Sequence, residues 1–182
     1  MATLRPFRDY DEKDVINLFS LQTGATLPVL KGTMVKLHTT GWQSDQELSL
    51  LGDVGTSVTN VTSQRYGVAA NVDLCGATDM PLGMLLHDVR STDENGELLK
   101  FNPRKAAEME AVIEGQAVPI VTKGIFLMKD IAGSTPTVGA KIYAAASGEI
   151  TTTAGSSVEI GICLGAEAND ETLILLDINR HD

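Results

Sequence analysis

The side chains that most often carry out chemistry in proteins are few in this chain and lie far apart. The histidines are His38, His87 and His181, and the cysteines are Cys75 and Cys163. His38 and His87 fall on expected strands, with no cysteine or carboxylate at the spacing of a metal site, so we interpret them as structural or solvated histidines. The two cysteines form no CxxC motif. We interpret them as small buried hydrophobes, with a disulfide as the alternative.

Sequence motifs of enzymes are also missing. The chain contains no GxSxG, HExxH, GxGxxG or GxxxxGK[ST] pattern. The acidic run from Asp9 to Asp14 lacks the glycine and the spaced acids of a calcium loop, so we interpret it as a solvated surface or one that meets a basic partner. We therefore predict no catalytic residue, no cofactor and no metal site. An enzyme whose catalytic residues come from distant parts of the chain is a remaining alternative.

The length and the net charge of the chain limit the classes of function that it can have. The 182 residues suffice for one large domain, or one domain with an appendage. A net charge of −10 argues against nucleic-acid binding, which needs clustered lysine and arginine. No apolar run is long enough for a signal peptide or a membrane span, so we expect synthesis in a cytoplasm and no membrane partner.

The first 24 residues, MATLRPFRDYDEKDVINLFSLQTG, differ from the rest of the chain. Residues 1–42 hold four of the chain's eight aromatic residues and carry a charge of +1, whereas residues 43–182 carry −11. Aromatic residues and arginine commonly anchor protein interfaces. Two interpretations follow. Residues 1–24 form an extended arm that docks on a partner, or they pack on the chain's own core as a strand and a short helix.

The remaining residues predict an all-β fold, because short runs rich in Thr, Val and Ile alternate with glycine-containing turns. We expect strands at 31–38, 65–74, 82–89, 118–128, 140–145, 158–164 and 172–178. Asn95-Gly96 predicts a hairpin turn. Asn102 as N-cap and Pro103 in the first turn predict a short helix to about Met109. The fold we predict is a compact β-barrel or roll over residues 25–182, with the arm over residues 1–24 and at most one or two short helices.

Several stretches resemble a known family. The segments RPFRDYDEKDVINLFSL, KGTMVKL, ENGELLKFNPRKAAEM and GQAVPIVTKGIFL are similar to a head structural protein of large tailed bacteriophages. The segments VGAKIYAAASGEITTT, VEIGICLGA and LILLDI are similar to the β-barrel modules of phage capsid decoration, or cement, proteins. The resemblance covers most of the chain. It consists of strand and glycine patterns rather than catalytic residues.

The resemblance implies a structural virion protein, made in the host cytoplasm, that binds the outer capsid surface and stabilises neighbouring capsomers. Its partners would be the major capsid protein and itself, as a homo-oligomer, with a trimer favoured over a dimer. An arm could add a strand to an exposed sheet edge of the capsid. The residues that would contact the capsid are Arg5, Phe7, Arg8, Tyr10, Ile16 and Phe19. The alternative from another class is a β-barrel adhesion or ligand-binding module displayed on the virion.

Overall fold

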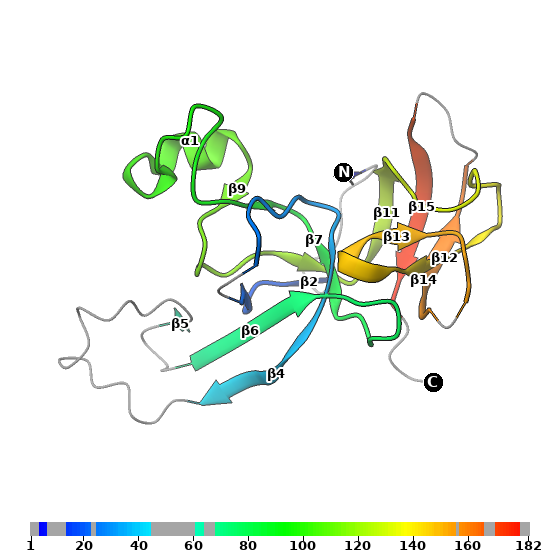
Figure 1. Ribbon diagram of the computed structural model, residues 1–182, viewed down its shortest axis with the longest axis horizontal. Helices are drawn as coiled ribbons and strands as arrows, with labels where there is room; N and C mark the ends of the chain where they lie inside the picture. Colours follow the sequence, from blue (N-terminus) through cyan, green and yellow to red (C-terminus); the bar gives the residue numbers. More distant parts are fainter. Residues whose placement is uncertain are drawn as a thin grey trace.

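The computed structural model describes residues 4–6, 14–22, 25–44, 61–63, 68–155, 157–165 and 170–178. Within them the chain is mostly β-structure, which confirms the all-β prediction (Figure 1). One α-helix, α1 (Pro103–Glu108), is present in these ranges, and it begins as predicted, because the Asn102 side chain accepts a hydrogen bond from the Lys105 backbone N–H.

The strands form three sheets. Sheet A is antiparallel throughout, in the order β1 (Leu4–Pro6), β11 (Lys123–Met128), β15 (Thr172–Asp177), β14 (Glu159–Cys163), β12 (Lys141–Ala144) and β13 (Ile150–Thr151). Sheet B has the order β2 (Val15–Ile16), β10 (Ile120–Val121), β7 (Gly83–Leu85), β4 (Met34–Ser44), β6 (Val68–Leu74) and β3 (Ser20–Leu21), with β5 (Val61–Ser63) beside β6. The third sheet pairs β8 (Asp88–Val89) with β9 (Ala111–Val112) in parallel.

The centre of sheet B lies between two hydrophobic cores, because successive residues of a strand point to opposite faces. On one face Met34, Met84 and Val121 join the first core, and on the other Val35, Leu85 and Ile120 join the second. Both faces of these strands are apolar, which is why KGTMVKL and LGMLL read as short continuous apolar runs rather than as strict alternation.

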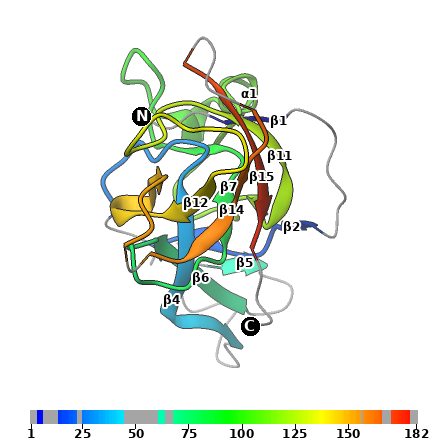
Figure 2. The same cartoon turned by 90° about the vertical axis from the view of Figure 1, so that its right-hand side faces the viewer.

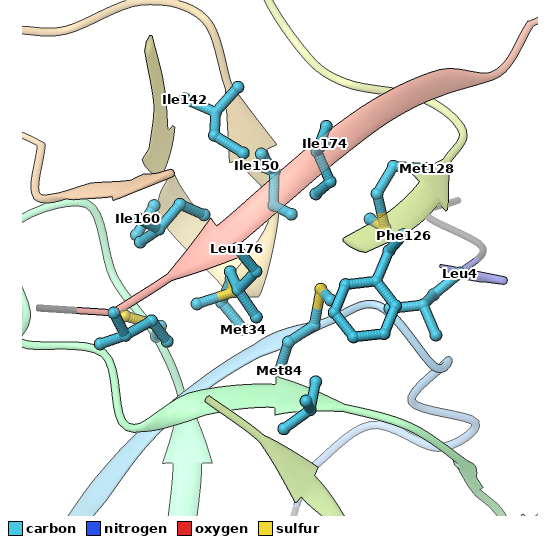
Figure 3. Packing of buried hydrophobic residues seen from close by; sticks show 14 of the residues in the cluster. Leu4, Met34, Met84, Phe126, Met128, Ile142, Ile150, Ile160, Ile174 and Leu176 are labelled. Carbon is cyan, nitrogen blue, oxygen red and sulfur yellow. The ribbon is translucent and has the colours of Figure 1, made fainter. Parts of the chain in front are cut away.

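The first core fills the space between the two sheets (Figure 3). Phe126, Ile174 and Leu176 of sheet A pack there with Met34 and Met84 of sheet B, and all five side chains are fully buried. The second core lies beyond sheet B and includes Phe19, Leu21 and Val118. One face of sheet A is thus covered by the protein itself, and the other face is not part of either core.

The strand predicted at 118–128 is divided between the two sheets. Its first part forms β10 in sheet B, and the chain then turns at Thr122 and continues as β11 in sheet A. The Thr122 N–H donates to the Asp14 carbonyl at 2.8 Å, and the Thr122 carbonyl accepts from Ile178 N–H at 3.2 Å. The next residue but one, Gly124, lies in β11. A side chain would not fit at this position, because a Cβ would lie 2.7 Å from the Phe126 ring. The chain therefore changes sheets where we predicted a single strand.

The described parts of residues 1–24 are built into both sheets. Strand β1 pairs with β11, β2 pairs with β10, and β3 runs parallel to β6. Leu4 is buried in the first core and Phe19 in the second. These parts pack on the chain's own core, as the second of our two interpretations expects, and they do so as strands. The division into an arm, residues 1–24, and a body, residues 25–182, stays a prediction.

Candidate interaction surfaces

The two cysteine side chains are buried. Cys75 and Cys163 are free and buried, so no disulfide joins them. Burial raises the pKa of the Cys75 thiol to about 11, with a further contribution from the Asp79 carboxylate, and burial also raises the pKa of Cys163. A thiol in such a site is inert, because the thiolate is the reactive form. Among the described residues, no cluster of three or more His, Cys, Asp or Glu is arranged to hold a metal ion.

One lobe stands out from the sheets, between β8 and β9, and we name it the α1 lobe (residues 91–109). It lies at the upper left of Figure 1 and holds α1 together with the Asp93–Gly96 turn. Its centre is the carboxylate of Asp93, which is buried and accepts hydrogen bonds from the N–H groups of Asn95 and Glu97, both at 2.8 Å. The Lys105 ammonium lies 3.0 Å from the same carboxylate. The turn and the helix are therefore fixed to each other.

The surface of the α1 lobe carries apolar side chains that have no cover. The Phe101 residue is 77% exposed and Leu98 is 44% exposed, while Leu99 between them is buried and anchors this stretch. The Lys100 ammonium lies 5.0 Å from the centre of the Phe101 ring, within the range of a cation–π contact. An aromatic side chain this exposed, on a rigid support, is typical of an interface anchor rather than of a monomer surface.

The outer face of sheet A, on the side away from the first core, is also apolar. It faces the viewer in Figure 2. Aliphatic residues lie opposite each other on neighbouring strands there. Their side chains are half-buried, except that Leu164 is exposed. The apolar residues of this face are Ile125, Leu127, Ile162, Leu164, Leu173 and Leu175. A sheet with one solvated face normally places polar side chains on that face, so this apolar face is a candidate interaction surface.

Ion pairs between neighbouring strands border the outer face. Lys123 pairs with Asp177 at 3.5 Å, and Lys141 pairs with Glu159 at 2.6 Å. A pocket of about 500 Å³ opens at the end of the face where these ion pairs lie. Apolar side chains line it, together with the two acidic residues of the pairs, Glu159 and Asp177. Its lining residues are Met80, Val158, Glu159, Gly161, Ile162, Leu175 and Asp177. Met80 is 62% exposed, so the apolar wall of this pocket is open to solvent.

The predicted capsid-contact residues divide into three groups. Arg5 lies in β1 at the edge of sheet A, in register with Leu127 of the outer face. Ile16 is half-buried in β2, and Phe19 is buried in the second core, so contact of Phe19 with a partner would require it to leave that core. The three others, Phe7, Arg8 and Tyr10, lie outside the described residues.

Sequence reasoning missed Phe101 and the outer face, although signals for both are present. The run LILL at residues 173–176 is apolar at every position, which places apolar residues on both faces of its strand. In LLKFNPRK, Phe101 directly precedes the N-cap of a short polar helix, outside any strand that could bury it.

All strands of sheet A except β1 lie in the part of the chain that matches a known protein family. Residues 106–178 match the phage cement protein family. The match runs from within α1 to Ile178, just past the end of β15, and so includes all six apolar residues of the outer face. Over this part of the chain it confirms the resemblance to phage cement proteins seen in the sequence. Comparison with curated proteins and with solved structures gives no match.

The cement family is a family of structural proteins, so the match supports a structural role in the phage capsid, with the capsid as binding partner. It gives no support to the adhesion alternative. In the part of the chain that the structure describes, no helix has the length and apolarity that crossing a membrane requires.

Proposed function

We propose that this protein is a capsid decoration protein, which binds the outer surface of the mature shell and stabilises neighbouring capsomers without catalysis. The observation that carries the proposal is the cement-family match over residues 106–178, which contain all six residues of the outer face of sheet A. A cement protein needs a rigid body and an uncovered surface. The buried core between the sheets supplies the first, and the outer face supplies the second.

The capsid contact that we propose combines the arm with the end of this face that lies next to Arg5, where Leu127, Leu164 and Leu173 meet, and leaves the pocket at the other end uncovered. Strand β1 is an edge strand of sheet A, and Arg5 lies opposite Leu127 in the ladder, so the arm and the outer face are continuous at this edge. Arg5 and Arg8 would pair with acidic groups of the capsid, and Phe7 and Tyr10 would supply apolar contacts. Many copies on a regular lattice multiply contacts that are weak singly.

Co-sedimentation with undecorated, expanded shells of the phage that encodes the protein tests the proposal. Saturation at a number of copies that matches the shell lattice would support it. Binding at only a few sites per particle, or none, would reject it in favour of a fibre, tail or adhesion role. The variant Phe7→Ala/Arg8→Ala/Tyr10→Ala tests the arm separately, and Asn17→Ala, an exposed residue between β2 and β3, is its control.

A further inference from the structure

We propose that copies of this protein associate head to tail, with Phe101 of one copy inserted into the pocket between β14, β15 and Met80 of the next. The inference goes beyond capsid binding, since it assigns the surface through which the protein contacts itself. It commits to a second copy as the occupant of the pocket, and it does not require a shell to be present.

The ring and the pocket are both apolar, and the pocket is large enough to hold the ring. Phe101 protrudes from the rigid α1 lobe with 77% of its surface exposed, and the pocket is a hollow of about 500 Å³ with Ile162, Leu175 and the exposed Met80 in its wall. A phenyl ring is much smaller than this hollow, which leaves room for Leu98 at the rim. Inserting the ring would remove from water the largest uncovered apolar side chain of the described residues.

Charge adds a second complementarity. Residues 98–105 contain Lys100, Arg104 and Lys105 and no acid, in a chain of net charge −10. Lys105 is held by the buried Asp93. Arg104 pairs with the exposed Glu108 at 3.1 Å, and exposed pairs of this kind are weak. Lys100 and Arg104 are therefore available to a partner beside Phe101.

Glu159 and Asp177 bring carboxylates to the pocket. Each has a lysine from the neighbouring strand, Lys141 and Lys123, but these pairs are exposed and a carboxylate can accept from a second cation. Of the exposed acids of the lobe, Glu94 and Glu97 lie on its turn, before the cationic stretch, and Glu108 is the partner of Arg104. When Phe101 inserts into the pocket of a second copy, Lys100 and Arg104 beside it would come close to the two carboxylates of that pocket.

The geometry makes this contact intermolecular. Figure 1 shows the α1 lobe on one side of the molecule and β14 and β15 on the other, so Phe101 cannot reach the pocket of its own chain. A contact between two different surfaces of the same protein is heterologous, and it forms a ring when the rotation closes and an open chain when it does not. Either arrangement would link neighbouring copies on a shell.

A heterologous contact has a signature that an isologous one lacks, which is complementation between two defective variants. Phe101→Ser removes the inserted ring and keeps the pocket. Met80→Arg keeps the ring but places a cation in the pocket wall against Lys100 and Arg104. Both residues are exposed, so both variants should fold. Val138→Ser is the control, since Val138 is 69% exposed and lines neither surface.

Sedimentation velocity over a range of concentrations measures the result. We expect the wild type and Val138→Ser to associate, and each of the two variants to associate at least about tenfold more weakly. An equimolar mixture of the two variants should form a 1:1 pair, because one copy retains the ring and the other the pocket.

Four results would overturn the inference: a monomeric wild type, unchanged association of Phe101→Ser, unchanged association of Met80→Arg, or a mixture that stays monomeric. Loss of shell binding by Phe101→Ser with intact self-association would instead assign the ring to the capsid, and would also overturn it. Shell binding by the wild type is measured separately, so failure of the proposed function remains distinguishable.

Discussion

Lys105 in helix α1 lies 3.0 Å from the buried carboxylate of Asp93, at the turn on the other side of the same lobe. This pair joins the two halves of the α1 lobe, and it supports the stretch that presents Phe101. Loss of the Asp93 charge would free the helix from the turn.

Replacing Asp93 by Asn should therefore lower stability in a pH-dependent way. The Lys105 ammonium, followed by the N–H groups of Glu97 and Asn95, holds the pKa of Asp93 below its ordinary value. A lowered folded-state pKa contributes stability above the unfolded-state value of about 3.9, and this is lost as the pH falls through the folded-state pKa. Urea unfolding should show Asp93→Asn to be less stable than the wild type at pH 7, with a smaller difference at pH 3. Glu94→Gln, on the exposed part of the turn, is the control, and a pH-independent difference would contradict this interpretation.

Phe19 should behave as a core residue. It is 8% exposed and packs in the second core, directly before strand β3, which pairs with β6. Phe19→Ala should lower the free energy of unfolding by about 3–5 kcal/mol, as large-to-small substitutions in cores do. Denaturant unfolding measures this, with Asn17→Ala as the exposed neighbour that should change little. A loss below about 1 kcal/mol would indicate that this segment leaves the core readily.

Gly161 should not tolerate a side chain. It lies where β14 passes β15, and a Cβ at this position would meet the Leu175 carbonyl oxygen and backbone. Gly161→Ala should cost about 1–3 kcal/mol of stability, because the two strands must move apart. Gly165→Ala is a suitable control, since its Cβ would approach no atom closer than the Leu173 Cβ at 3.4 Å. Equal thermal stability of the two variants would show that β14 adjusts freely.

Cys75 should be slow to react in the folded protein. Its pKa of about 11 lowers the thiolate fraction at pH 8 by about a hundredfold relative to an ordinary thiol, and burial limits access further. An Ellman assay at pH 8 should show slow reaction in buffer and fast reaction in urea. The Cys75→Ser variant reports Cys163 alone. Fast labelling of the native protein would mean that the turn after β6 opens often.

Much of the fold was accessible from local sequence patterns. The strands β12, β14 and β15 form within a residue or two of the predicted ranges, and Asn102 caps the helix as expected. These elements are specified by near neighbours in the chain: apolar runs, glycine positions and an N-cap. The Asp93–Gly96 turn also forms, with Asp93 N–H donating to the Glu97 carbonyl at 2.9 Å and Gly96 at a φ of 86°.

Which strands pair in which sheet could not be predicted from local sequence patterns. The division of residues 118–128 at Thr122 depends on contacts with Asp14 and Ile178, which lie far away in sequence. Strands of two or three residues, such as β1 and β2, have too short a pattern to be recognised alone, and the composition of the first 24 residues did not distinguish a docking arm from edge strands. Exposure of Phe101 likewise follows from the lobe's three-dimensional position, since a Phe in a sequence is more often buried.

The most direct test of the proposed role measures shell stability with and without the protein. Expanded shells filled with DNA and lacking the protein are prepared, the purified protein is added to saturation, and the temperature at which DNA is released is recorded. A cement role predicts release at a higher temperature after addition, with a partial effect for Phe7→Ala/Arg8→Ala/Tyr10→Ala and a full effect for Asn17→Ala. An unchanged release temperature on shells that are fully decorated would contradict capsid stabilisation.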